Sequence, residues 1–266
     1  MHNVFLAFLL TLLSGLATGI GGLITLFTKR SDNRFLSVSM GFSAGVMIYV
    51  SMIELFPEAN VLLTGMYGAK SGSLYTVLAF FAGMFLIALI DKFIPEEENP
   101  HEMASCPLPA VQNSSAKSLH RTGLMTALAI AIHNFPEGIA AFVSASQSLR
   151  VALPIVIAIA IHNIPEGISV AMPIYCSGGS RKKALGYSFL AGLSEPLGAL
   201  IGYLILLPFM NDAIFGILYA VVAGIMVFIS FDELLPGAEV YGEHHLAIYG
   251  LVGGMAVMAL SLWLFI

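Results

Sequence analysis

Charged side chains are scarce in this chain of 266 residues, because Asp, Glu, Lys and Arg together supply only 10% of it. A soluble domain normally carries about a quarter of such residues. Hydrophobic residues make up 58% of the chain, and the mean hydropathy is +0.90. These values exclude an ordinary soluble domain and predict an all-α, polytopic membrane protein.

Cysteine is almost absent as well, with only Cys106 and Cys176. Both fall in segments that the charge pattern below assigns to the cytosol, so we expect free thiols. A positively charged start is also missing, since the chain opens with Met1-His2-Asn3. We therefore expect the first apolar run to stay in the membrane as a span, not to be cleaved as a signal peptide.

The apolar runs predict a single transmembrane domain, residues 1–266, because a spanning helix needs about 20 mostly apolar residues. The eight expected helices are 4–28, 35–57, 73–94, 121–146, 151–175, 184–208, 213–236 and 246–266. The one long connection, residues 91–120, holds four prolines and three consecutive glutamates, which is typical of a flexible loop. His101 and His120 could sample metal there, but two scattered histidines fit a solvated linker better.

Lys and Arg are distributed unevenly between the two sides of this bundle. Nine lie in or beside the turns after the first, third and fifth expected helices: Lys29, Arg30, Arg34, Lys92, Lys117, Arg121, Arg181, Lys182 and Lys183. The other side has only Lys70 and Arg150. Because cytosolic loops are enriched in these residues, we expect both termini on the non-cytosolic side and the 91–120 loop in the cytosol.

One polar motif occurs twice within this apolar sequence. Residues 130–140 and 159–169 are identical at 9 of 11 positions, and each contains His-Asn-x-Pro-Glu-Gly. The copies supply His133, Asn134 and Glu137, and then His162, Asn163 and Glu166. An ionisable group in the middle of a span costs roughly 2.5–3.5 kcal/mol on insertion scales, which favours a functional site over polar residues that merely satisfy one another.

The spacing within each copy places its three polar residues on one helical face near the middle of the bilayer. At about 100° per residue, the carboxylate lies between the imidazole and the amide. If the two faces meet, imidazoles and carboxylates form one group, and amides and carboxylates form another. Glu195, the only charged residue within 184–208, is a natural addition to the second group.

These groups predict two adjacent metal positions that share carboxylates. Two imidazoles with two carboxylates suit Zn²⁺, whereas amide and carboxylate oxygens suit harder ions such as Fe²⁺ and Mn²⁺. The motif prolines, Pro136 and Pro165, either free carbonyl oxygens along an ion path or only bend the helices.

A second, weaker repeat lies outside the first. Residues 44–57 align without gaps on residues 223–236 and share 7 of 14 positions, including Glu54 and Glu233. The expected orientation makes these copies run in opposite directions, which predicts a 3+2+3 arrangement with helices 1–3 and 6–8 as inverted repeats. Glu54 and Glu233 either pass cations along a pathway or sit at the membrane interface.

The paired His-Asn-x-Pro-Glu-Gly, followed by Ser-Glu-Pro-Leu-Gly on the next helix, resembles the ZIP (Zrt/Irt-like) family of divalent metal transporters, most closely its bacterial members. The resemblance implies an eight-helix importer in the cell inner membrane with a binuclear site. For the zinc-type position it implies Glu137, His162 and Glu166, with His133, and for the second position Asn134, Glu137, Asn163, Glu166 and Glu195. The loop after the third helix lacks the histidine-rich tract of many eukaryotic members.

We therefore expect a transporter that takes up Zn²⁺ and also Fe²⁺, Mn²⁺, Co²⁺ or Cd²⁺, and not an enzyme; the metals are substrates and not catalytic cofactors. An intramembrane zinc hydrolase is the alternative, but its His-Glu-x-x-His helix is absent. On the residues alone, efflux is equally open. The expected partners are divalent metal ions and the lipid bilayer, without nucleic acid, and a homodimer stays open.

Overall fold

The structure is a computed structural model. It describes residues 4–27, 33–92, 113–147, 149–176, 180–206, 209, 211–241 and 244–264. Every regular element in these ranges is helical, and none of the described residues forms a strand, so the all-α prediction is confirmed. Most of the expected 91–120 loop, together with His101 and Cys106, lies outside the described residues.

The helices follow one another along the chain with short connections where these are described. They are α1 (Val4–Thr25), α2 (Asn33–Val50), η1 (Ser51–Leu55), α3 (Phe56–Tyr67), α4 (Ala69–Lys92), α5 (Asn113–Gln147), α6 (Leu149–Cys176), α7 (Arg181–Gly192), α8 (Ser194–Ile201), η3 (Gly202–Leu206), α9 (Asp212–Ile229), η5 (Ser230–Leu234), α10 (Leu235–Tyr241) and α11 (His244–Leu264). The three η elements are π-helical turns.

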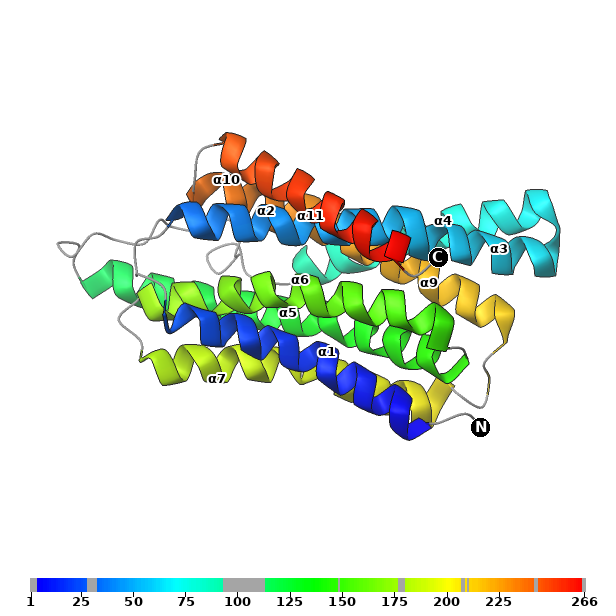
Figure 1. The fold of residues 1–266 in the computed structure, drawn as a ribbon, viewed down its shortest axis with the longest axis horizontal. Helices are drawn as coiled ribbons and strands as arrows, with labels where there is room; N and C mark the ends of the chain where they lie inside the picture. The colour runs from blue at the N-terminus through cyan, green and yellow to red at the C-terminus, as the bar shows by residue number, and fades with distance from the viewer. Residues whose placement is uncertain are drawn as a thin grey trace.

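The helices lie side by side along the long axis of the molecule, and α1 begins at the same end at which α11 finishes (Figure 1). Among the described residues, seven helical stretches are long and apolar enough to cross a membrane: Val4–Thr25, Arg34–Tyr67, Ala69–Ile90, Ala152–Met172, Arg181–Ile205, Asp212–Glu239 and His244–Leu264. The chain is therefore a multi-pass membrane protein. α5 is not among these seven stretches, so the expected count of eight spans stays a prediction.

Two helices run past the prolines at which we expected them to end. The range expected to finish at residue 57 continues as helix to Tyr67, and the range expected to finish at residue 236 continues to Tyr241. Both predicted ends were wrong for the same reason, since an interior proline normally breaks a helix.

A π-helical turn directly before each proline explains why these helices continue. In η1, the backbone N–H of Phe56 donates to the carbonyl of Ser51, five residues earlier, and Pro57 follows. In η5, Leu235 donates to Ser230 in the same way. Proline has no N–H and its ring crowds the preceding turn, so one wider turn before it lets the helix resume beyond.

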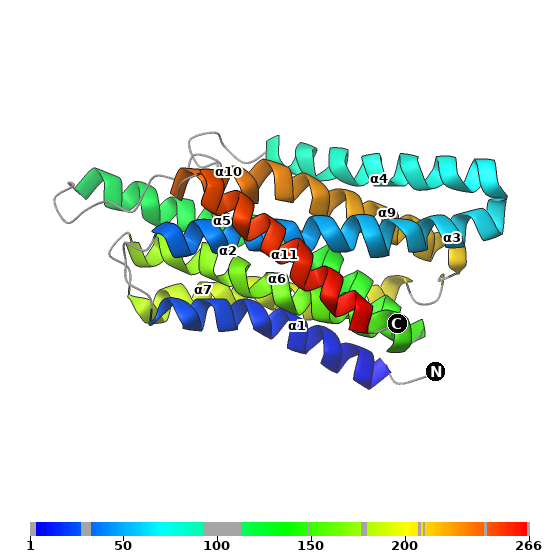
Figure 2. The ribbon, with the colours of Figure 1, turned by 45° about the horizontal axis from the view of Figure 1, so that its top comes forward.

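The helices form two groups, one above the other in the view of Figure 1, and Figure 2 shows α11 crossing in front of α2 and α6. In one group, α2 packs against α11, and α9 packs against α3 and α4. In the other, α6 packs against α1, α5 and α7, and α5 also packs against α8. The main connection between the groups is α2 against α6, with a smaller contact of α5 with α9.

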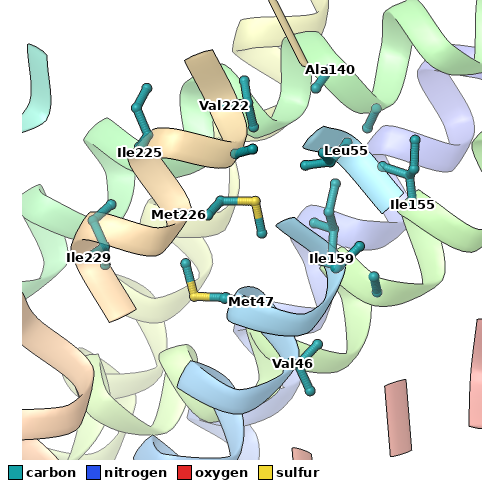
Figure 3. Close-up of a cluster of buried hydrophobic side chains, with 14 of the residues drawn as sticks. Val46, Met47, Leu55, Ala140, Ile155, Ile159, Val222, Ile225, Met226 and Ile229 are labelled. Atoms are coloured by element: carbon teal, nitrogen blue, oxygen red, sulfur yellow. The ribbon is translucent and has the colours of Figure 1, made fainter. Parts of the chain in front are cut away.

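The surface between the two groups is mainly apolar. Figure 3 shows Met47 of α2, Met226 of α9 and Ile159 of α6 within a buried cluster that also includes Leu55 and Ala140. Polar contacts between described residues cross it as well. The Ser43 hydroxyl of α2 donates to the His162 carbonyl of α6 at 3.2 Å, and Tyr219 of α9 bonds Ser144 of α5 at 2.6 Å.

Glycines allow the closest helix contacts in the first group. A side chain at Gly45 of α2 would collide with the Leu251 backbone of α11, and one at Gly254 of α11 would collide with the Phe42 backbone of α2. In the same way, a side chain at Gly224 of α9 would collide with the Phe80 backbone of α4, and one at Gly83 of α4 would collide with the Val221 backbone of α9. Small residues of this kind are the usual means of close packing between membrane helices.

Candidate functional site

Both copies of the His-Asn-x-Pro-Glu-Gly motif lie within continuous helix, the first in α5 and the second in α6. These two helices pack against each other, and side chains of the two copies lie 3.1 and 3.4 Å apart across the contact, so the copies face one another. All six polar side chains are buried, with at most 1% of any of them exposed: His133, Asn134, Glu137, His162, Asn163 and Glu166.

The histidines and glutamates of the two copies pair crosswise. Nε2 of His133 lies 3.1 Å from Oε2 of Glu166, and Nε2 of His162 lies 3.4 Å from Oε2 of Glu137. Within the second copy, Nε2 of His162 is 4.0 Å from Oε1 of Glu166. Each imidazole therefore meets the carboxylate of the other helix more closely than its own.

Many polar atoms of this cluster have no hydrogen-bond partner. Although His133 and Glu166 are 3.1 Å apart, the pair lacks hydrogen-bond geometry, and both glutamate oxygens are unsatisfied. The other unsatisfied atoms of the motifs are Nδ1 and Nε2 of His133, both amide atoms of Asn134, Oε1 of Glu137, Nδ1 of His162 and Oδ1 of Asn163. Buried polar atoms nearly always have partners, so such a concentration makes this cluster the candidate site.

Glu195 of α8 lies beside the second motif, where it is hydrogen-bonded. Its Oε1 accepts from Nδ2 of Asn163, and its Oε2 lies 2.5 Å from the hydroxyl of Ser14 on α1. It is also within electrostatic reach of Glu137 and Glu166. The structure thus brings Glu195 to the cluster through Asn163, and Ser14 is a neighbour that the sequence analysis missed.

Ser14 did leave a signal in the sequence. Thr11, Ser14 and Thr18 form a line of small polar residues at helical spacing within an otherwise apolar stretch, and all three are buried. Such a line predicts a helix face directed toward protein instead of lipid.

Close approaches of backbone surround the cluster on both sides. Between α5 and α8, a side chain at Gly138 would collide with the carbonyl of Glu195, and one at Gly198 would collide with that of Phe135. The motif glycine thus lets a neighbouring helix approach beside the polar residues.

The approach between α6 and α1 has the same form. A side chain at Gly167 would meet the carbonyl of Thr18, and one at Gly21 would meet that of Ile164. The two motif helices are therefore each held against one outer helix by a reciprocal pair of glycines.

Glu54 and Glu233 occupy corresponding places outside the cluster, Glu54 within η1 and Glu233 within η5. Both are half-buried. Glu233 is close enough to His133 to act on it electrostatically, and Glu54 acts in the same way on Tyr219. They lie on the helix group that faces the motif helices.

The acidic and histidine residues near the end of α10 are mostly exposed. Nδ1 of His244 lies 2.7 Å from Oε1 of Glu239, with 65% and 45% of these side chains exposed, and the His245 ring stacks on Tyr249. These side chains are therefore on the surface and not part of the buried cluster.

A multi-pass bundle of apolar helices that buries imidazole, amide and carboxylate groups on two adjacent helices defines a membrane protein with an internal polar site. The sequence comparisons identify its kind. The sequence model of the family described as ZIP Zinc transporter matches residues 92–262. The chain belongs to the ZIP family of zinc transporters, as its motifs predicted.

Its relatives match over almost their entire lengths. The chain is 61% identical to the zinc transporter ZupT of Streptococcus mutans over 265 residues, covering 100% of this chain and 99% of the relative. It is 60% identical to that of Clostridium perfringens over 281 residues, covering 100% and 98%. With the ZupT of Lysinibacillus sphaericus it shares 58% over 269 residues, covering 99% of each. The family is one of transporters, so the hydrolase alternative is not favoured.

Proposed function

We propose that this protein carries Zn²⁺ across the cell inner membrane into the cytosol, through a metal site in the cluster between α5 and α6. The observation that carries the proposal is the crosswise pairing of His133 with Glu166 and of His162 with Glu137, all fully buried. The zinc transporters ZupT to which the chain is similar support zinc as the cargo. Uptake as the direction is what the resemblance of the motifs implies.

The spacing of the paired atoms fits a zinc ion. Ligands about 2.0–2.1 Å from a tetrahedral Zn²⁺ lie roughly 3.3 Å from one another. The two crosswise separations of 3.1 and 3.4 Å bracket that value. Among the described residues, no three His, Cys, Asp or Glu side chains already surround a single point, so His133, Glu137, His162 and Glu166 would close around the ion by small side-chain rotations.

The second position of the binuclear site would use oxygen ligands. Its set is Asn134, Glu137, Asn163, Glu166 and Glu195. Both asparagines have a buried Oδ1 without a hydrogen-bond partner, which is the atom that an amide offers to a cation. Such a set accepts harder ions, so Fe²⁺, Mn²⁺, Co²⁺ and Cd²⁺ are further candidate substrates.

The proposed architecture is one domain, residues 1–266, with eight spans in a 3+2+3 arrangement. The reciprocal glycine contacts support it. The Gly45–Leu251 and Gly254–Phe42 approaches of α2 and α11 have counterparts in the Gly224–Phe80 and Gly83–Val221 approaches of α9 and α4. Inverted repeats that exchange the first three spans with the last three would produce this correspondence.

The same reciprocal pattern relates the two outer helices of the site. The contacts of Gly138 and Gly198 between α5 and α8 correspond to those of Gly167 and Gly21 between α6 and α1. Gly15 of α1 also meets the carbonyl of Gly192 on α7, and Gly192 meets that of Gly15. A two-fold axis that passes near Gly15 and Gly192 would exchange α1 with the two consecutive helices α7 and α8.

The proposed orientation places both termini outside the cytosol. Arg34 lies in the first turn of α2, Lys92 ends α4, and Arg181 begins α7, so all three lie at the end of the bundle opposite to the start of α1 (Figure 1). The enrichment of basic residues on the cytosolic side supports this orientation. Glu54, toward the outer side, would then receive ions, and Glu233, toward the inner side, would release them.

Zinc uptake into vesicles tests the proposal. Purified protein reconstituted into liposomes should accumulate Zn²⁺, and Glu166→Ala protein of the same fold and orientation should not. Glu239→Ala, which removes an exposed carboxylate outside the cluster, serves as the matched control and should transport normally. Normal uptake by the Glu166→Ala protein would refute the proposed site.

A further inference from the structure

Ser14 on α1 touches the cluster twice, through its carbonyl and through its hydroxyl. The carbonyl oxygen accepts a hydrogen bond from Nδ2 of Asn163 at 3.0 Å, and the hydroxyl lies 2.5 Å from Oε2 of Glu195. The same Nδ2 donates to the other oxygen of Glu195. Ser14, Asn163 and Glu195 therefore form a closed network contributed by three different helices.

This network fixes the orientation of the Asn163 amide. A carbonyl oxygen can only accept, so the NH₂ group of Asn163 must face Ser14, and both of its hydrogens are then used. The amide oxygen is left on the opposite side, buried and without a hydrogen-bond partner. Asn134, at the equivalent place in the first motif, has no partner for either amide atom, so nothing comparable orients it.

The Ser14 hydroxyl has two acceptors within reach but only one proton. Besides Glu195, it lies 2.9 Å from the carbonyl oxygen of Thr11, one turn earlier in α1. When Glu195 turns away from Ser14, the hydroxyl can donate to Thr11 and does not become an unsatisfied buried group, which would cost about 1–3 kcal/mol. Glu195 can therefore turn onto an ion without leaving the Ser14 hydroxyl unpaired, although it gives up its bond from Asn163, which the ion has to replace.

We propose that Ser14 is a positioning residue that sets the selectivity of the oxygen-rich half of the metal site. Its backbone carbonyl turns Oδ1 of Asn163 toward the ion. Its hydroxyl, the group that Ser14→Ala removes, positions Glu195 beside the site, from which Glu195 can bind an ion that prefers oxygen ligands, such as Mn²⁺. This inference rests on the proposed metal site. The crosswise His133–Glu166 and His162–Glu137 pairs do not contact Ser14, so Zn²⁺ bound there depends on it much less.

The test compares Mn²⁺ and Zn²⁺ in Ser14→Ala protein. Loss of the hydroxyl should weaken Mn²⁺ binding by about tenfold, as expected when an outer partner of a metal ligand is removed, while Zn²⁺ binding changes little. Ser14→Thr keeps a hydroxyl and should restore the Mn²⁺ affinity. Thr11→Val is the matched control, because the Thr11 hydroxyl is buried on the same helix but donates only to Ala7 within α1.

Two measurements separate this inference from the proposed function. Titration of Mn²⁺ and Zn²⁺ against purified protein in detergent measures binding without transport, and vesicle uptake gives the KM for each ion. An unchanged ratio of Mn²⁺ to Zn²⁺ affinity in Ser14→Ala protein would overturn the role of Ser14, as would equal weakening of both ions. If Ser14→Ala protein does not fold, Ser14→Cys, a weaker donor of similar size, is judged by the same ratio. Failure of the wild-type protein to take up zinc would refute the proposed function and leave the binding ratio to decide on Ser14.

Discussion

His133 of α5 and Glu166 of α6 lie 3.1 Å apart at the centre of the bundle, and each belongs to a different copy of the same motif. The crosswise arrangement means that neither motif is complete alone. An ion held here would join α5 to α6, so loss of one residue weakens the ligand set of both helices.

His133→Ala should therefore lower the affinity for Zn²⁺ by more than the 10–100-fold that loss of an outer partner costs, because a direct ligand is removed. Isothermal titration of purified protein measures this loss. His245→Ala, which removes an exposed imidazole at the start of α11, should bind zinc as the wild type does. Equal affinities of wild-type and His133→Ala protein would contradict the crosswise site.

Replacement by aspartate should affect protein stability differently at the two asparagines. At Asn163, a carboxylate would face the Ser14 carbonyl and the Glu195 carboxylate, both of which now accept from its NH₂ group, so Asn163→Asp should destabilise the protein. At Asn134, where neither amide atom has a partner, Asn134→Asp breaks no hydrogen bond, so it should destabilise the protein less than Asn163→Asp and should strengthen binding of Mn²⁺. The melting temperature and Mn²⁺ titration of the two variants check this. A lower melting temperature for Asn134→Asp than for Asn163→Asp would show that the amides are oriented differently.

Gly138→Ala should destabilise the bundle, because the added methyl group would collide with the backbone of α8 at Glu195. Overpacking of this kind costs typically 1–3 kcal/mol, here about 2 kcal/mol. Gly65→Ala is the control, since nothing lies within 4 Å of a Cβ at that position in α3. Thermal unfolding in detergent should give a lower midpoint for the first variant only; equal midpoints would mean that α5 and α8 are not in close contact.

Tyr219→Phe should loosen the contact between the two helix groups. Because Ser144 donates to the Ala140 carbonyl, the phenol of Tyr219 is the donor to Ser144, and its loss leaves the serine with one partner. The expected destabilisation is about 0.6 kcal/mol, the average for such bonds between membrane helices. Tyr249→Phe, at an exposed position on α11, should leave the melting temperature unchanged. If both variants have the melting temperature of the wild type, the Tyr219–Ser144 hydrogen bond does not contribute to stability.

The sequence allowed prediction of what depends on local pattern. Hydropathy placed the helices, and the repeated motif identified the six polar residues that the structure buries between α5 and α6. Two identical motifs place the same side chains on the same face of their helices, and packing of the two helices against each other can bring these faces together. The crosswise choice of partners depends on how the two helices are rotated against each other, which no local pattern fixes.

The role of Ser14 and the ends of two helices could not be predicted. Ser14 lies 181 positions before Glu195, so their contact is a product of the tertiary fold. Pro57 indicated a helix end because a proline in a regular α-helix disrupts it. The compensating π-helical turn depends on backbone hydrogen bonds five residues apart, for which Ser51–Leu55 carries no composition signal.

The π-helical turns have a consequence for experiments that map which residues face lipid. A turn that holds one extra residue advances everything after it by about 100° relative to an unbroken α-helix. A single helical wheel drawn through residues 33–67 would therefore assign the wrong side of α3 from Phe56 onward, and one drawn through 212–241 would misplace α10. In labelling scans of these two helical stretches, a separate helical wheel is needed for the residues before and after each π-helical turn, Ser51–Leu55 and Ser230–Leu234.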